Sequence, residues 1–229
     1  MIVGLAMLVL APAAMADETV YAVPVDKYSS EVITIDQGEA LIFRNVDLNR
    51  HDLVSKTQAG GKPLFSTPLQ STGGEALVQG VQQLKGGSYP FLCSIHTYMT
   101  GTLVVTGAGA PSPAPGPSDT TAPKVGVKVL DSSVSKVRKN GKLRVELTSD
   151  EAGNGTVEAS MRSGGKSTVI ARGTRGFARP GKATVAMPLT KTGKRLLRGK
   201  SSASVTVLAQ VKDAAGNDGR GTGKRTLKR

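Results

Sequence analysis

Four side chains in the first half of this sequence have the types and the spacing of a metal site. Cys93, His96 and Met99 follow one another as Cys-x2-His-x2-Met, and His51 lies well upstream. A thiolate, two imidazoles and a weakly bound thioether suit copper in a trigonal electron-transfer site. A tight loop between two strands could turn Cys93, His96 and Met99 toward one point. His51 would then come from a neighbouring strand or loop and close the site.

Few other metal or nucleophilic sites can be built from this composition. The chain has one Cys and two His, which excludes a disulfide framework, a four-thiolate zinc or iron–sulfur site, and haem attachment through Cys-x-x-Cys-His. Catalytic zinc with an open position and a Cys–His nucleophilic dyad remain as alternatives. Methionine is a poor zinc ligand, no general base is evident near the loop, and no oxyanion-hole motif accompanies the dyad. Copper is therefore the favoured interpretation.

The elements that must position these residues have the pattern of short β-strands. Apolar residues alternate or cluster in segments bounded by Gly and Asn, and no helical period appears. The expected strands are 31–36, 40–44, 75–78, 87–93 and 101–106. In the fourth of them Tyr89, Phe91 and Cys93 share one face, which places the thiol at the end of an aromatic core face. This half is predicted to be a small β-sandwich.

Charge and aromatic content divide the chain into two halves. Residues 17–106 carry six basic and nine acidic side chains, a net of −3, whereas residues 107–229 carry 24 basic and eight acidic ones, a net of +16. Seven of the eight Phe and Tyr residues precede residue 107. Residues 107–122 are rich in Pro, Gly, Ala and Ser, which is typical of an extended spacer. We expect a domain at 17–106, a linker at 107–122 and a second domain at 123–229.

The second half also has the pattern of a β-sandwich, with a strongly basic surface. Seven strands are expected, at 125–130, 143–148, 156–161, 167–171, 183–189, 203–211 and 221–227, with a short helical turn at 190–197. Its basic clusters have no interleaved aromatic residues for base stacking, so no nucleic acid partner is expected. The charge is either a solvated surface or an attraction to an anionic cell-wall polymer or membrane surface.

The N-terminus has the features of an export signal. Residues 1–16 are uncharged and mostly apolar, and Ala14-Met15-Ala16 fits the small-residue pattern at which signal peptides are cleaved. This predicts a mature chain that starts at Asp17 and is periplasmic, cell-wall-associated or extracellular. The alternative is a buried N-terminal strand or helix. Because no basic residue precedes the apolar run, the natural start could lie upstream of Met1.

Two segments of the first half resemble a known family. Residues 89–105, YPFLCSIHTYMTGTLVV, resemble the copper loop and final strand of cupredoxins of the plastocyanin/amicyanin type, in the short amicyanin-like spacing. Residues 43–51, FRNVDLNRH, are similar to the strand and loop that bring in the first histidine of that family. The resemblance implies one type 1 copper per chain, cycling between Cu(I) and Cu(II). Its ligands would be His51, Cys93, His96 and Met99.

The same resemblance implies roles for residues around the ligands. The family often has Asn directly after the first histidine, hydrogen-bonding toward the Cys loop, and Asp52 stands at that position. Asp52 and Ser94 are therefore expected next to the ligands. The loop histidine of the family exposes a ring edge within an apolar patch where partners dock, which implies that role for His96. The residues expected around it are Tyr98, Pro63 and Leu64.

The predicted architecture is all-β. Residues 119–125 and 213–217 resemble parts of bacterial immunoglobulin-like modules, which usually carry no chemistry. We thus expect a cupredoxin-type Greek-key β-sandwich followed by a second, immunoglobulin-like β-sandwich. The function implied is an exported blue copper protein, not an enzyme, that transfers single electrons between redox partner proteins. Two alternatives stay open: an extracytoplasmic copper carrier or storage protein, and a non-redox surface interaction protein with a cupredoxin-like fold.

Overall fold

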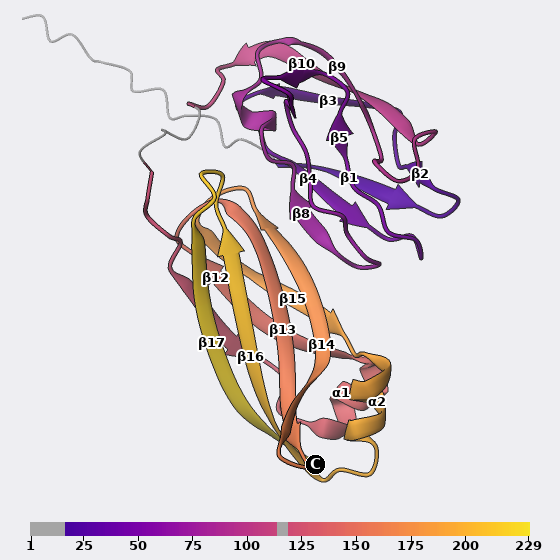
Figure 1. Ribbon diagram of the computed structural model, residues 1–229, viewed down its shortest axis with the longest axis vertical. Coiled ribbons are helices and arrows are strands. Elements are labelled where there is room, and N and C mark those ends of the chain that lie inside the picture. Colours follow the sequence, from indigo (N-terminus) through magenta and orange to yellow (C-terminus); the bar gives the residue numbers. More distant parts are fainter. Residues whose placement is uncertain (1–16, 114–118) are drawn as a thin grey trace, which may run out of the picture.

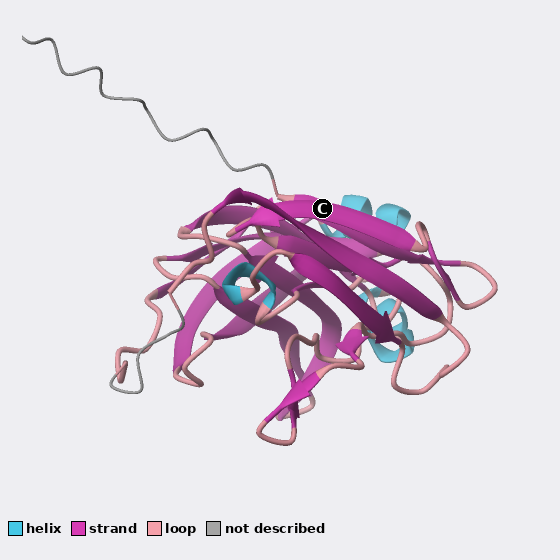
Figure 2. Cartoon of the chain, turned by 90° about the horizontal axis from the view of Figure 1, so that it is seen from above, coloured by secondary structure: helices cyan, strands magenta, loops and turns pink. Residues whose placement is uncertain are grey.

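Two β-sandwiches lie end to end in the computed structural model, which describes residues 17–113 and 119–229 (Figure 1). Strands make up most of both sandwiches, and helices are few and short (Figure 2). The predicted export signal at 1–16 lies outside the described residues. No helix within the two described ranges is long and apolar enough to cross a membrane. The all-β prediction is confirmed.

The first sandwich consists of two four-stranded sheets. One has the order β2 (Lys27–Tyr28), β1 (Glu18–Val23), β4 (Leu41–Asn45) and β8 (Glu75–Leu77). The other has the order β3 (Val32–Gln37), β10 (Thr100–Gly109), β9 (Gly87–Leu92) and β5 (Val54–Ser55). Pairs β1/β4 and β3/β10 are parallel, so both sheets are mixed. A hairpin of β6 (Gln58–Ala59) and β7 (Lys62–Pro63) and a 3₁₀ turn η1 (Val81–Gln83) complete the domain. The five strands expected in this half are present, whereas β1 and the two-residue strands were not foreseen.

The core of the first sandwich follows the period of two expected for strands. In β3 the buried side chains are Ile33 and Ile35, and β10 supplies Leu103. The rings of Tyr28 and Phe91 meet edge to face, with centroids 4.9 Å apart. Cys93 and Met99 belong to the same buried cluster as these residues. The candidate metal site is therefore an extension of the hydrophobic core.

The second sandwich packs a three-stranded sheet on a four-stranded one. The first has the order β11 (Val125–Val129), β12 (Lys142–Ser149) and β15 (Gly181–Pro188), and the second has the order β14 (Lys166–Phe177), β13 (Gly153–Ser163), β16 (Ser202–Lys212) and β17 (Asp218–Lys228). All its strand pairs are antiparallel. Helix α2 (Lys191–Leu197) is the predicted helical turn, whereas α1 (Val134–Asn140) was not predicted. Seven strands in two sheets are consistent with an immunoglobulin-like sandwich.

The linker begins later than the composition predicts. Strand β10 continues to Gly109, where it pairs with Gln37. Three residues beyond, the Ser112 N–H donates to the carbonyl of Gln82 at 2.7 Å. The first part of the expected spacer thus belongs to the first sandwich. The boundary at 106 was too early, because the Pro-rich composition begins before the strand ends.

The two sandwiches are in direct contact through β8 of the first domain and β13 and β14 of the second. The side-chain amide of Asn154 accepts from Leu77 N–H at 2.8 Å and donates to Leu77 C=O at 3.2 Å, as a neighbouring strand would. Thr174 Oγ1 accepts the Glu75 N–H at 2.9 Å. The Glu75 carboxylate pairs with Arg175 at 2.7 Å. Strand β8 is the edge strand of its sheet, and side chains of the second domain cover that edge.

Small apolar residues close the same interface. A cluster of Ala40, Ile42 and Leu77 is buried, and Ala152 and Ala178 of the second domain pack against it. Gly176 of β14 lies so near β8 that a Cβ there would be 2.2 Å from Leu77 N. Residue 176 must therefore be glycine for the two edges to approach this closely.

Gly176→Ala is expected to weaken this interface. The added methyl group would overlap the β8 backbone, and overpacking of this kind costs about 1–3 kcal/mol of unfolding free energy. Small-angle scattering should report a larger radius of gyration, and chemical denaturation should report a lower stability. Gly107→Ala is the matched control, because its methyl group would have no atom within 4 Å. Wild-type scattering and stability in Gly176→Ala would contradict the interface.

Candidate metal centre

The Cys-x2-His-x2-Met segment forms a closed loop between two adjacent strands. Cys93 directly follows β9, and Met99 directly precedes β10. The Met99 N–H donates to the His96 carbonyl at 2.8 Å, and the Cys93 N–H donates to the Met99 carbonyl at 3.0 Å. The β9/β10 pairing fixes both ends of the loop. The spacing thus produces the tight turn that the sequence suggests.

Three donor atoms meet at this loop. His51 Nδ1 and His96 Nδ1 each lie 3.8 Å from Cys93 Sγ, and the two nitrogens lie 3.1 Å apart. Nitrogen and sulfur donors lie roughly 2.0–2.3 Å from an ion such as zinc, so donors that share one ion are at most about 4.6 Å apart. The three atoms fit a single transition-metal ion. Met99 is 2% exposed and packs in the same core cluster as Cys93.

The site is shielded from water on the side of the core. His51 and Cys93 are fully buried, and His96 is half-buried. Burial raises the pKa of the Cys93 thiol, while backbone N–H groups of Asp52, Ile95 and His96 oppose that rise. Those N–H groups favour the thiolate, which is the form of cysteine that binds metals.

Two carboxylates set the orientation of the His51 ring. His51 Nε2 lies 3.1 Å from Asp47 Oδ2 and 3.4 Å from Asp26 Oδ1. Burial alone would raise the pKa of Asp47, but the backbone N–H groups of Leu48 and Asp26 and the contact with His51 lower it below its usual value. An ionised carboxylate only accepts hydrogen bonds, so Nε2 carries the proton. Nδ1 is then the lone-pair nitrogen, and it faces Cys93.

Asp52 and Ser94, both predicted to lie near the ligands, are brought together. The Asp52 carboxylate accepts the Ser94 N–H at 2.7 Å and also the Ser94 hydroxyl. The buried Tyr28 hydroxyl donates to the Asp52 carbonyl at 2.8 Å. Asp52 therefore joins the residue after His51 to the residue after Cys93, even though the resembling family often has Asn there.

Of the residues predicted for partner docking, Tyr98 makes a ring contact with His96. The rings of His96 and Tyr98 have centroids 6.0 Å apart, and Tyr98 is 69% exposed. Pro63 lies exposed in β7, and Leu64 packs against the core cluster. Among the described residues, no hydrogen bond or ring contact joins Pro63 or Leu64 to His96. Two exposed apolar residues that were not predicted, Leu48 and Ile95, lie on the loops that bear the ligands.

The polar residues behind His51 were also not predicted. Asn45 is fully buried, and its amide donates to the carbonyls of Asn49 at 2.7 Å and Gln70 at 2.9 Å. Its oxygen accepts the Asp47 N–H at 2.9 Å. One signal was available in the sequence, because Asn45 follows the apolar run Leu41–Phe43 by two positions and so falls on the same strand face as Phe43. Nothing comparable marks Asp26 or Gln70.

The comparison with protein families agrees with this geometry. Residues 1–105 match the family model described as a cupredoxin-like domain. The N-terminal half of the chain is a cupredoxin-like domain. No curated protein matches the chain.

Several solved structures resemble part of the chain. A copper-containing nitrite reductase from Thermus scotoductus SA-01 is 29% identical over 45% of this chain, with a TM-score of 0.34, and the chain covers only 24% of that enzyme. A purple cupredoxin from Nitrosopumilus maritimus is 23% identical over 39% of this chain and 100% of that one, with a TM-score of 0.33. An amicyanin variant in the reduced Cu(I) form is 19% identical over 41% of this chain and 86% of that one, with a TM-score of 0.34.

Asp52→Ala is expected to destabilise the metal-free protein. It removes both acceptors of Ser94 in a mostly buried place, a loss that costs about 1–3 kcal/mol. Asp52→Asn is the matched control, because an amide can accept the Ser94 N–H and donate to the hydroxyl, and it should lose much less. Denaturant unfolding of the two variants measures the difference. Equal stability of Asp52→Ala and the wild type would contradict the assigned contact.

Proposed function

We propose that this protein holds one type 1 copper ion and transfers single electrons between redox partner proteins. The observation that supports it is the convergence of His51 Nδ1, Cys93 Sγ and His96 Nδ1 within 3.8 Å. Met99 in the same loop is the proposed weak axial ligand. Two imidazoles, a thiolate and a distant thioether form the donor set of blue-copper electron-transfer sites.

Burial of the ligands favours electron transfer over copper carriage. The bound ion would supply a one-electron couple between Cu(I) and Cu(II). His51 and Cys93 are fully buried and held by strand pairing and hydrogen bonds, which limits their movement between the two oxidation states. A carrier must release its ion readily, and enclosed ligands oppose release. The ligands of this chain therefore suit an ion that stays in place.

His96 is the proposed point of electron entry. It is half-buried, whereas His51 is fully buried, so its ring is the ligand nearer to solvent. Exposed Tyr98, Ile95 and Leu48 are apolar or aromatic and lie on the loops that bear the ligands. An apolar surface of this kind suits a redox partner that docks briefly and leaves.

We propose that the protein is exported and that its second domain anchors it to an anionic cell-wall polymer or membrane surface. The anchor would be the end of the second domain that lies opposite the first domain. Helices α1 and α2 and the C-terminus lie together there (Figure 1). We define this basic end as residues 131–144, 162–166, 191–202 and 228–229, which contain 14 Lys and Arg and one acidic residue, Asp131. Asp131 is buried and pairs with Arg144 at 2.8 Å.

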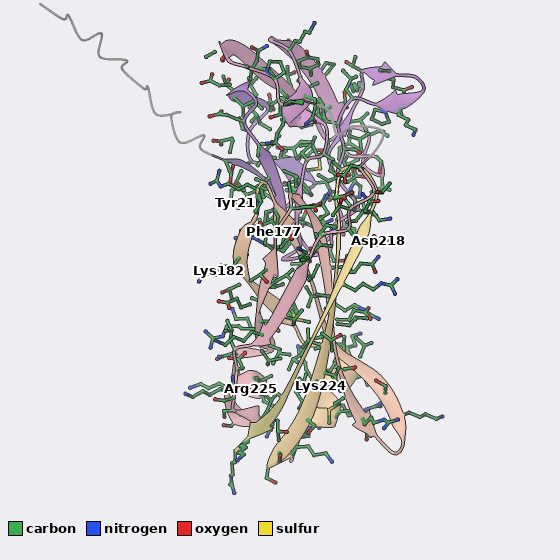
Figure 3. The ribbon with its side chains drawn as sticks, turned by 90° about the vertical axis from the view of Figure 1, so that its left-hand side faces the viewer. Tyr21, Phe177, Lys182, Asp218, Lys224 and Arg225 are labelled. Atoms are coloured by element: carbon green, nitrogen blue, oxygen red, sulfur yellow. The ribbon has the colours of Figure 1, made fainter. Side chains whose placement is uncertain are left out.

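Most acidic residues of the second domain lie at the end opposite the basic end. Five of its eight acidic residues lie toward the first domain: Asp119, Asp150, Glu151, Asp213 and Asp218. In Figure 3, Asp218 lies near the junction of the domains, and Lys224 and Arg225 lie further along β17 toward the basic end. The basic end thus carries a net charge of +13 out of the +16 of residues 107–229, as a surface anchor requires.

Cys93→Ala tests the copper proposal. Removal of the thiolate should abolish the intense blue charge-transfer band that the wild type develops with one equivalent of Cu(II), measured by visible absorption. Met99→Leu is the matched control in the same loop. It should keep the band and raise the reduction potential, because the axial ligand tunes the potential. A persistent blue band in Cys93→Ala would refute the assignment.

Double charge reversal tests the anchor. Lys194→Glu with Arg195→Glu should weaken cosedimentation with anionic vesicles or cell-wall material about tenfold or more at low salt. Binding by the wild type should fall steeply toward roughly 1 M salt, where the screening length is about 3 Å. Lys62→Glu with Lys85→Glu makes the same charge change on the first domain and should have little effect. Salt-independent binding, or equal loss in both variants, would contradict the anchor.

A further inference from the structure

The hydroxyl of Thr174 bridges the two domains. Thr174 lies in β14 of the second domain, and its Oγ1 donates to Gln70 Oε1 at 2.7 Å while accepting the Glu75 N–H at 2.9 Å. A hydroxyl has a single proton to donate, and Gln70 receives it. A Cβ on Gly74 would lie 2.8 Å from Gln70 Oε1 and 3.0 Å from Thr174 Oγ1. The missing side chain at Gly74 is what leaves room for the bridge.

Gln70 depends on this bridge for its side-chain position. It is 3% exposed, and its Nε2 donates to the Pro68 carbonyl at 2.8 Å. Its Oε1 accepts from Thr174. Without the Thr174 hydroxyl, a buried amide oxygen would lose this partner, which is costly in a protein interior. The second domain therefore holds the Gln70 side chain in place.

The main chain of Gln70 in turn holds His51. The Gln70 N–H donates to the His51 carbonyl at 2.7 Å, and the His51 N–H donates to the Gln70 carbonyl at 3.0 Å. These two bonds form an isolated antiparallel bridge rather than part of a longer strand pair. Further along the same two segments, the Thr67 N–H donates to the Leu53 carbonyl at 3.0 Å. At His51 itself, Gln70 supplies both backbone partners, so a shift of Gln70 acts directly on the backbone position of His51.

A second route from Gln70 reaches the His51 ring. The Gln70 carbonyl accepts the Asn45 amide at 2.9 Å, and Asn45 Oδ1 accepts the Asp47 N–H at 2.9 Å. Asp47 Oδ2 lies 3.1 Å from His51 Nε2. Both the backbone of His51 and the carboxylate that orients its ring are thus connected to Gln70.

We propose that Thr174 is a positioning residue for His51 and that the second domain is therefore a structural part of the metal centre. The expected change in the copper spectrum rests on the proposed copper function, whereas the contacts between Thr174, Gln70 and His51 do not depend on it. Thr174 acts through Gln70 and touches neither the ion nor a donor atom. The second domain then has a role that a spacer or a surface anchor alone would not have.

The test compares three variants of the full chain. Thr174→Val removes the hydroxyl and keeps the shape, and Thr174→Ser keeps the hydroxyl. Thr222→Val makes the same chemical change at an exposed position of β17 in the same sheet. In the metal-free protein, amide hydrogen exchange at His51 and Gln70, measured by NMR, should be about tenfold faster or more in Thr174→Val, since a buried hydrogen bond is lost. Thr174→Ser and Thr222→Val should exchange like the wild type.

The copper-loaded variants provide the second measurement. Thr174→Val should change the intensity ratio of the charge-transfer bands and the copper hyperfine splitting, and Thr174→Ser should restore both. Wild-type exchange at His51, or a wild-type copper spectrum, in Thr174→Val would overturn the proposal. Faster exchange spread evenly over the first domain would overturn it too, because it would indicate general destabilisation. Failure of the wild type to bind copper would instead refute the proposed function, while the exchange rates would still decide whether Thr174 positions His51.

Discussion

Three electron-rich donor atoms face one another in the core of the first domain, and most of the surrounding structure holds them there. Nitrogen and sulfur lone pairs at 3.1–3.8 Å repel one another unless a proton or a cation lies between them. The sandwich must therefore impose their arrangement. Strands β9 and β10 close the ligand loop, Asp52 ties that loop to the His51 segment, and Asp47 fixes the ring of His51. A site built this way is pre-organised for an ion before the ion binds.

The most local features of the site could be predicted from the sequence. Cys93, His96 and Met99 lie in one short loop, so their spacing alone limits the geometry. The strands of the second domain were also predictable, because alternation of apolar residues is a local signal. Helix α1 was missed because its seven residues contain only two apolar ones, Val134 and Val137, which is too short a pattern to indicate a helical period. Ser133 accepts the Lys136 N–H at its start, and Gly141 ends it with a φ of 65°.

The contacts that could not be predicted join residues far apart in the chain. Thr174 and Gln70 are separated by 104 positions. Asp26, which contacts His51, lies in the turn between β1 and β2. A threonine in a strand has no special signature, and neither has a glutamine in a loop. Gly74 and Gly176 are the nearest to a signal, yet a glycine indicates a close approach without saying what approaches. The docking role expected for Leu64 stays a prediction, and its partly buried side chain packs against the core cluster that contains Cys93 and Met99.

The two proposed surfaces act independently in electrostatic terms although the domains are joined mechanically. Strand β17 has 11 residues, and at about 3.4 Å per residue it spans roughly 37 Å between the domain junction and the basic end. Exposed charges are screened over about 10 Å at 0.1 M salt. The basic end is therefore more than three screening lengths from the cupredoxin-like domain, and it cannot steer a redox partner toward His96. Under the proposed function, partner approach to His96 would then depend on the apolar residues beside it and on the first domain's own charge of −3. In an anchored molecule, the positive potential of the basic end would thus not reach the proposed electron-transfer surface around His96.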